Sequence, residues 1–163
     1  MLRVNLEAPV RTTRALLPGM LDRGSGHLVY VSSLAGKVPS PRASMYNATK
    51  FGLRGFTLAL RQDLRGTGVG ASLVLPGFIR GAGMFADADM KPPPGIGTST
   101  PEKVAEAVGQ AVETNKPEFV VAPPQARAVS AFGSSFPNVA AVFQRGSGER
   151  IAEELASKQT DKR

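Results

Sequence analysis

A tyrosine and a lysine four residues apart are the side chains whose types and spacing most clearly suggest chemistry. Tyr46 is one of two tyrosines in the chain, and Lys50 follows it in a stretch rich in small residues. On a helix, residues four apart share one face, about 6 Å from each other along the axis. A free phenol titrates at about pH 10, and an ammonium close to it favours the charged form. The pair therefore predicts a general acid and base that works near neutral pH, with a surface pair of no function as the alternative.

A hydroxyl precedes this pair at the end of an expected strand. The run HLVYVSS is short, apolar and rich in β-branched residues, which predicts a buried strand closed by Ser33. Side chains at the carboxyl ends of parallel strands face the crevice in which open α/β sheets bind ligands. Ser33 is therefore expected to hold a substrate oxygen beside the Tyr46 phenol. Ser32 is a weaker candidate, because alternation along a strand points it to the other side.

The elements that must position these residues alternate along the chain. Apolar spacing and turn residues predict helices over 2–20, 44–64 and 102–115 and strands over 27–33, 70–77 and 118–123. This order is typical of a parallel sheet with crossover helices, and the strands are apolar on both faces, as buried parallel strands are. The sequence thus predicts an α/β fold, a partial Rossmann-like doubly wound parallel sheet of about three strands with flanking helices. Residues 1–124 are expected to form this domain, and residues 125–163 a C-terminal helical extension.

Composition narrows the class of protein. The chain has 163 residues, 42% of them hydrophobic and 20% charged, which is ordinary for one soluble domain. It has no cysteine and a single histidine, His27, so neither a disulfide framework nor a zinc site is expected. No apolar run approaches the roughly 20 residues of a membrane span, and the charged N-terminus does not fit a signal peptide, which favours a cytoplasmic protein. The net charge of +7 leaves nucleic-acid binding as an alternative, but the arginines are scattered and no nucleic-acid-binding motif accompanies them.

The glycine- and proline-rich loop after the second expected strand carries two further groups of residues. Met84, Phe85 and Met90 are expected to cover an apolar substrate, with simple packing as the alternative. Asp87 and Asp89 lack the further acidic or histidine partners that a metal site needs. We therefore expect a solvated loop there and no metal.

The strand closed by a serine, with Tyr-x-x-x-Lys thirteen residues after that serine, resembles the short-chain dehydrogenase/reductase family. The family's helix with a catalytic asparagine is similar to VNLEAPVRTTRALLPGM, where the asparagine is Asn5. Its sixth strand and Pro-Gly cofactor loop are similar to LVLPGFI, and its last major helix and seventh strand to TPEKVAEAV and EFVVAP. The resemblance spans about residues 2–123.

The resemblance implies a function and a set of catalytic residues. Tyr46 would be the acid and base, Ser33 would orient the substrate oxygen, and Asn5 would complete the catalytic set. Lys50 would lower the pKa of the phenol and hydrogen-bond the nicotinamide ribose. The implied reaction is hydride transfer between a nicotinamide and a secondary alcohol or ketone, a small molecule that the loop suggests is apolar.

The same resemblance implies where NAD or NADP binds. Besides Tyr46 and Lys50, the segment with Pro76, Gly77 and Ile79 would pass the nicotinamide, with the backbone of Ile79 reaching the carboxamide. The family often has a threonine two residues later, where this chain has glycine. A hydroxyl contact to the cofactor phosphate is therefore not expected. The choice between NAD and NADP stays open, because its determinant lies in a part of the family with no counterpart here.

Pro9 allows a physical test of the role of Asn5. Proline has no N–H, so the helix cannot hydrogen-bond the carbonyl of the residue four positions earlier, which is Asn5. A free buried carbonyl needs a partner, most simply an ordered water. Such a water would suit a proton relay from Lys50 to solvent. The alternative is that Pro9 only kinks the helix.

The first half of the family has no counterpart in this sequence. A doubly wound domain normally opens with a strand and a glycine-rich phosphate turn, whereas G-x-G-x-x-G is absent here. Roughly 80 to 90 residues would supply that half, so we expect Met1 to be a misplaced start or a truncation. The alternative function is a catalytically inactive truncated fragment that serves only in oligomerisation. Its close-packing residues would be Ala48, Gly52, Gly55 and Ala59, and a dimer or tetramer of identical chains is expected in either case.

Overall fold

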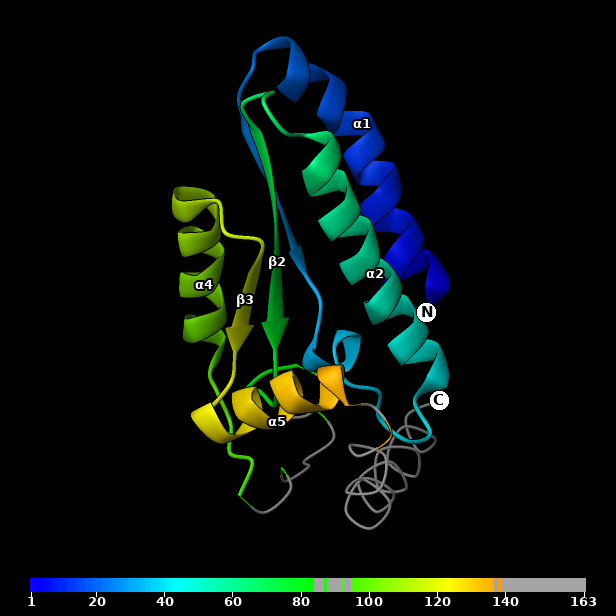
Figure 1. The fold of residues 1–163 in the computed structure, drawn as a ribbon, viewed down its shortest axis with the longest axis vertical. Coiled ribbons are helices and arrows are strands. Elements are labelled where there is room, and N and C mark those ends of the chain that lie inside the picture. Colours follow the sequence, from blue (N-terminus) through cyan, green and yellow to red (C-terminus); the bar gives the residue numbers. More distant parts are fainter. Residues whose placement is uncertain (84–86, 88–91, 93–94, 137, 139–163) are drawn as a thin grey trace.

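The protein is a three-stranded parallel sheet between helices (Figure 1). The computed structural model describes residues 1–83, 87, 92, 95–136 and 138. Its elements, in chain order, are η1 (Arg3–Glu7), α1 (Ala8–Asp22), β1 (Gly26–Val31), η2 (Leu34–Gly36), α2 (Ser44–Asp63), β2 (Val69–Pro76), α4 (Pro101–Thr114), β3 (Glu118–Val121) and α5 (Pro124–Ser135). The predicted α/β fold with three parallel strands and flanking helices is confirmed.

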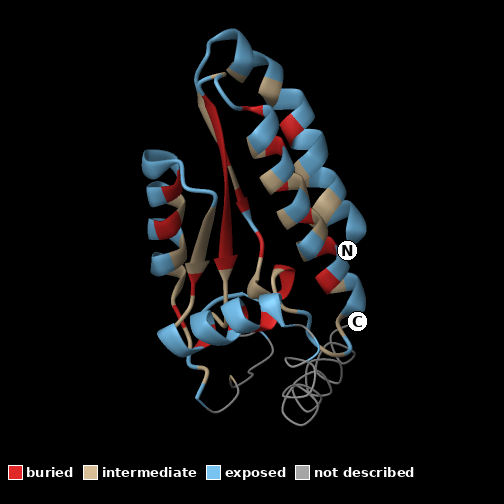
Figure 2. Ribbon diagram, in the orientation of Figure 1, coloured by how far each residue is buried: buried red, intermediate tan, exposed pale blue. Residues whose placement is uncertain are grey.

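The central strand β2 sets the register of the sheet. It pairs with β1 from Gly26↔Val69 onward and with β3 from Leu73↔Glu118 onward, both in parallel. Every residue of β2 before its last one is buried, and Figure 2 shows the strand buried along nearly its whole length. Small and β-branched side chains on both faces allow helices to cover both sides, as in buried parallel sheets.

The two faces of the sheet have separate cores. Helices α1 and α2 cover one face and α4 covers the other (Figure 1). The α2 side holds the larger core, which contains Leu53 of α2 and Leu73 of β2, while Val74 packs with Ala107 of α4 on the other side. Tyr30 lies in the larger core, with 8% of its surface exposed.

The first helix departs from the regular helix predicted over 2–20. The segment Arg3–Glu7 is a π-helix, and the backbone N–H of Ala8 bonds the carbonyl of Arg3, five residues back. Pro9 offers no N–H at the next position, so one widened turn accommodates the missing donor. Beyond it α1 is regular, and the Thr13 hydroxyl donates to the Pro9 carbonyl at 2.8 Å.

Helix α5 crosses the carboxyl ends of the strands (Figure 1). It lies at the start of the range expected to form a helical extension, but the sequence analysis did not give its bounds. It buries only Ala126, Ser130 and Gly133, and such small residues give little hydrophobic periodicity. Residues 139–163 of the expected helical extension lie outside the described residues, as do Met84, Phe85, Asp89 and Met90.

Candidate active site

Tyr46 and Lys50 lie in the first two turns of α2. Both are half-buried, and the Lys50 ammonium lies over the phenol ring with Nζ 5.6 Å from the ring centroid. A cation within about 6 Å of an aromatic face is attracted by the ring's quadrupole. The four-residue spacing thus brings the two side chains together on one face of the helix.

The Lys50 ammonium is partly removed from water. Burial lowers the pKa of Lys50. Within the described residues its Nζ has no hydrogen-bond acceptor and no ion pair. Its donors are therefore available to a ligand that carries hydroxyl groups.

A buried threonine joins Asn5 to the start of α2. The Asn5 amide donates to the Thr49 hydroxyl at 3.3 Å, and that hydroxyl donates to the Tyr46 carbonyl at 2.7 Å. Thr49 is completely buried. The link fixes the π-helical turn against the helix that carries both the phenol and the ammonium. Sequence reasoning missed Thr49, because its partner from η1 is 44 residues away.

The serines after β1 differ from what strand alternation predicts. The strand ends at Val31, and Ser33 follows in extended conformation as the N-cap of η2, where its Oγ accepts from the Ala35 N–H at 3.1 Å. The strand was expected to run to Ser33; it ends earlier because the serine hydroxyl starts a short helix instead. That acceptor bond leaves the Ser33 hydroxyl proton free to donate.

Ser32 is buried and serves the backbone. Its N–H donates to the Val74 carbonyl at 2.8 Å, and its hydroxyl donates to the Lys50 carbonyl at 3.3 Å. Gly36 packs beside the same carbonyl, since an added Cβ would lie 2.7 Å from the Lys50 oxygen. The backbone at Lys50 is thus held against η2 by two residues to which the sequence reasoning gave no such role.

The expected cofactor segment leaves the end of β2. Gly77 donates its N–H to the Val121 carbonyl at 3.0 Å, and an added Cβ there would lie 3.2 Å from the Leu34 side chain of η2. Pro76, Gly77 and Ile79 are half-buried, and Ile79 forms a bridge with Ser99. This turn therefore lies at the carboxyl end of the sheet, next to the short helix that Ser33 caps.

A hollow of about 600 Å³ runs along β1 on the side of α1. Asn5 and Lys50 both line it, together with residues 27–31 of β1, whereas Ser33 and Tyr46 do not. The structure thus brings Asn5 and Lys50 to one space and Tyr46 and Lys50 to one helix face.

His27 lies at the opposite end of β1 and belongs to a different cluster. Its Nε2 is 2.8 Å from the Ser72 hydroxyl, which donates its own proton to the Lys116 carbonyl at 2.6 Å. Nε2 must therefore carry the imidazole proton. Burial lowers the pKa of His27, and the charge of Arg61 lowers it further. In the described part of the chain, no three His, Cys, Asp or Glu side chains form a metal-binding group.

The model of the family described as short chain dehydrogenase matches residues 1–92. The chain belongs to the short-chain dehydrogenase family. The matched range contains every site residue expected from the sequence, from Asn5 to Ile79.

Named relatives of this short-chain dehydrogenase support the same family. The chain is 45% identical over 117 residues to "Ketoacyl reductase HetN" of Nostoc, covering 72% of this chain and 41% of the relative. It is 38% identical over 116 residues to "NADP-dependent 3-hydroxy acid dehydrogenase YdfG" of Escherichia coli K12, covering 66% and 46%. The chain thus spans less than half the length of these curated relatives.

Solved structures agree with the fold of this short-chain dehydrogenase. Serine dehydrogenase from Escherichia coli superposes with a TM-score of 0.61 at 34% identity, over 76% of this chain and 51% of that protein. The closed form of serine dehydrogenase complexed with NADP⁺ gives a TM-score of 0.64 at 32% identity, over 76% and 54%. Among the helices described, none is long and apolar enough to cross a membrane.

Proposed function

We propose that this chain carries the proton-transfer half of an oxidoreductase that moves hydride between NAD or NADP and a secondary alcohol or ketone. The observation that carries the proposal is the partly buried Lys50 ammonium, which lies over the Tyr46 ring and has no acceptor among the described residues. Tyr46 would transfer its phenolic proton to the ketone oxygen, and the Ser33 hydroxyl would donate a hydrogen bond to the same oxygen without losing its proton. The nicotinamide, when bound, supplies the hydride.

The residues present fit the nicotinamide end of such a cofactor. A partly buried ammonium without an acceptor suits the two hydroxyls of a ribose, because both can accept hydrogen bonds. The turn with Pro76, Gly77 and Ile79 would lie along the nicotinamide. Lys50 would thus hold the sugar, while Tyr46 on the same helix face handles the proton.

Asn5 would serve proton supply. Pro9 has no N–H for the Asn5 carbonyl, and Asn5 and Lys50 both line the hollow beside β1. An ordered water on that carbonyl would pass protons from solvent to Lys50 and on to Tyr46. The link through Thr49 would keep this carbonyl at a fixed place relative to α2.

The relatives suggest the substrates and the cofactor to test first. One is named a ketoacyl reductase, and another an NADP-dependent 3-hydroxy acid dehydrogenase. A serine dehydrogenase of similar fold is described in complex with NADP⁺. We therefore propose an oxo or hydroxy group on an acyl chain as the reacting group, with NADP as the preferred cofactor.

The test compares the two tyrosines of the chain. Purified protein is titrated with NADPH and NADH by nicotinamide fluorescence and assayed with 3-oxoacyl esters and 3-hydroxy acids. Tyr46→Phe should keep saturable cofactor binding and lose turnover by at least about a hundredfold, because general acid–base catalysis contributes that much. Tyr30→Phe is the matched control, since the Tyr30 hydroxyl pairs with Thr13 and has no proposed catalytic role, so turnover per folded molecule should be unchanged. Equal turnover of Tyr46→Phe and the unchanged protein would refute the assignment.

A second proposed role is self-association through η1, α1 and α2. Large apolar side chains are exposed there, among them Val4 at 72% and Met45 at 51%. Of the small residues expected at a contact, Gly52 instead packs inside the molecule, where an added Cβ would lie 3.0 Å from Leu6, while Gly55 faces open space. We propose a homo-oligomer, and light scattering of the purified protein would test it: a monomeric mass at micromolar concentration contradicts this role.

A further inference from the structure

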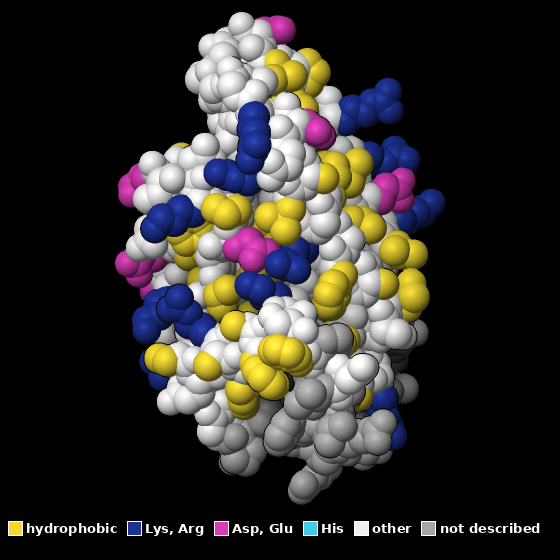
Figure 3. Space-filling view, viewed as in Figure 1, with side chains coloured by type: hydrophobic (Ala, Val, Ile, Leu, Met, Phe, Trp, Pro, Cys, Tyr) yellow, Lys and Arg dark blue, Asp and Glu magenta, His cyan; other side chains and the backbone are white. Residues whose placement is uncertain are grey.

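Glu118 is a charged residue that no catalytic pattern in the sequence points to. It is the first residue of β3, pairs with Leu73 of β2, and turns its side chain toward α2. Only 17% of that side chain is exposed. Figure 3 shows acidic and basic side chains adjoining in the middle of this face of the molecule. A carboxylate so far removed from water needs partners, because burying an unpaired charge is costly.

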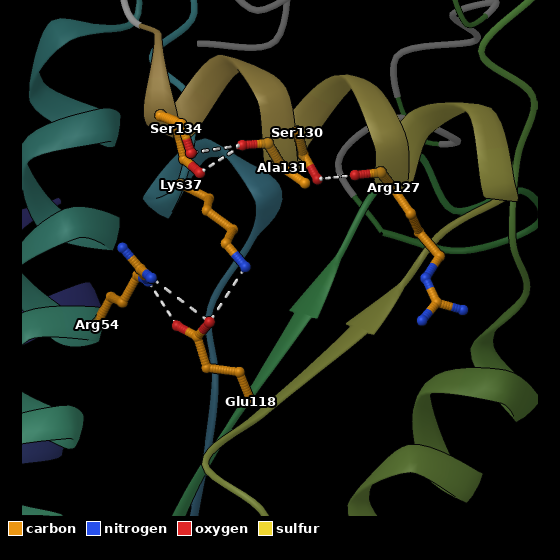
Figure 4. Close-up of polar contacts among 8 residues, drawn as sticks. Lys37, Arg54, Glu118, Arg127, Ser130, Ala131 and Ser134 are labelled. Atoms are coloured by element: carbon orange, nitrogen blue, oxygen red, sulfur yellow. Dashed lines mark hydrogen bonds and ion pairs between the residues drawn. The ribbon is translucent and has the colours of Figure 1, made fainter.

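Two cations hold the Glu118 carboxylate, one on each side (Figure 4). Arg54 donates from Nε to Oε1 at 2.5 Å and from Nη2 to Oε2 at 3.4 Å, and Lys37 donates from Nζ to Oε2 at 3.1 Å. Burial by itself would raise the pKa of Glu118, but the hydrogen bonds and charges of Arg54 and Lys37 outweigh burial and lower it. The carboxylate is therefore charged at neutral pH and shared between two chain segments.

Each cation belongs to a segment that carries a site residue. Lys37 is the C-cap of η2, the short helix that begins at the Ser33 N-cap. Arg54 lies one helical turn after Lys50 on α2. Glu118 is 81 residues from Lys37 and 64 from Arg54, so the carboxylate joins both segments to the edge strand of the sheet.

The loop between η2 and α2 is hydrogen-bonded near both of its ends. At its far end the Asn47 amide donates to the Ser40 carbonyl at 2.8 Å. At its near end Lys37 reaches Glu118. Because η2 is a single short turn, a displacement at Lys37 passes directly to Ser33. Loss of the carboxylate would also leave Lys37 and Arg54 as neighbouring like charges, which repel each other in a partly buried site.

We propose that Glu118 is a positioning residue, which sets the relative placement of Ser33 and of the Tyr46–Lys50 turn through its bonds to Lys37 and Arg54. The inference rests on the proposed function for its catalytic consequence. The bonds of Glu118 to Lys37 and Arg54, which we call the tether, are a property of the fold and can be tested without measuring activity.

The main experiment is Glu118→Gln in the purified protein, with Glu113→Gln as the matched control. Glu113 is an exposed glutamate on α4, and its side chain makes no hydrogen bond or ion pair with the described residues. Turnover of the Glu118 variant should fall about tenfold with KM for the carbonyl changed less than about twofold, because misplacing reacting groups by a fraction of an ångström affects the chemical step more than binding. Amide hydrogen exchange over residues 34–43 should become faster, while exchange in α4 stays the same.

Two further variants separate positioning from simple loss of stability. Glu118→Asp keeps the charge and should recover part of the turnover lost in Glu118→Gln. If Glu118 only stabilised the fold, turnover would not depend on whether the charge is kept. Arg54→Gln removes only the bonds between Glu118 and α2, and it can replace Glu118→Gln if that variant does not fold. It should lower turnover while exchange over residues 34–43 stays close to that of the unchanged protein, because Lys37 keeps its partner.

The outcomes are distinguishable. Unchanged exchange over residues 34–43 in Glu118→Gln overturns the tether, whatever the activity. Faster exchange with unchanged turnover overturns the catalytic consequence. If the unchanged protein itself shows no turnover with any carbonyl, the proposed function fails, and the exchange comparison alone then decides whether Glu118 holds the two segments together.

Discussion

Gly36 is a position at which even the smallest added side chain would press against the backbone of a candidate site residue. An alanine Cβ there would lie 2.7 Å from the Lys50 oxygen, 3.0 Å from the Lys50 carbonyl carbon and 3.1 Å from the Ser32 Oγ. Ordinary contact begins at 3.4 Å, so the main chain of η2 or of α2 must move by about 0.7 Å. Gly36 does not lie in the left-handed backbone region, so the steric clash accounts for the whole cost. Overpacking of this kind costs about 1–3 kcal/mol.

The movement falls on the backbone of Lys50, so it should affect function as well as stability. A misplacement approaching 1 Å can lower a rate by about a hundredfold, and we expect Gly36→Ala to lower turnover by about ten- to a hundredfold. Stability is measured by urea unfolding and turnover by oxidation of NADPH.

Gly55→Ala on α2 is the control for the Gly36 experiment. An added Cβ at Gly55 meets nothing within 4 Å, and alanine in a helix is favoured over glycine by about 0.5–1 kcal/mol. It should therefore stabilise the protein slightly without loss of turnover. If Gly36→Ala matches Gly55→Ala in both stability and turnover, the close approach of η2 to Lys50 does not constrain the site.

Two further predictions concern buried polar groups. The pKa of His27 is lowered by burial and by Arg61, so its neutral form favours the folded state; the stabilisation is complete above about pH 6.5 and is lost as pH falls through the folded-state pKa. Urea unfolding from pH 7.5 to 5 should show this slope, and His27→Gln should reduce it; an equal slope in both proteins contradicts the assignment. Thr13 donates to Pro9, so Tyr30 must donate to Thr13 at 2.6 Å. Tyr30→Phe should then lower the free energy of unfolding by about 1 kcal/mol. Thr13→Val leaves the buried Tyr30 hydroxyl without an acceptor and should lower it by about 1–3 kcal/mol. A smaller loss for Thr13→Val than for Tyr30→Phe in urea unfolding would contradict Tyr30 as the donor.

The sequence predicts the fold well where signals are local. Apolar runs bounded by glycine and proline locate all three strands within about three residues at each end, and the Thr100 side chain caps α4 as the Thr-Pro pair suggests. Tyr46 and Lys50 meet because a helix fixes their spacing. Pro9 correctly marks the position at which the first helix cannot remain regular.

The sequence predicts poorly what depends on contacts between distant segments. Glu118, Thr49 and Gly36 all contact residues from other elements, and no spacing rule links a carboxylate on β3 to a lysine 81 residues earlier. Ser33 was placed on the strand because alternation takes no account of a hydroxyl that captures the next free N–H. The bounds of helix α5 within the expected helical extension could not be predicted, because its buried stripe is made of small residues.

The π-helical turn in η1 changes how this segment can be compared with other proteins. A turn closed five residues back instead of four holds one extra residue, and one residue of an α-helix corresponds to a rotation of about 100°. Regular helical counting from α1 would therefore assign Asn5 to the wrong side. A relative with one residue fewer between this asparagine and the proline would present a neighbouring side chain to Thr49, even if every letter around the gap matched.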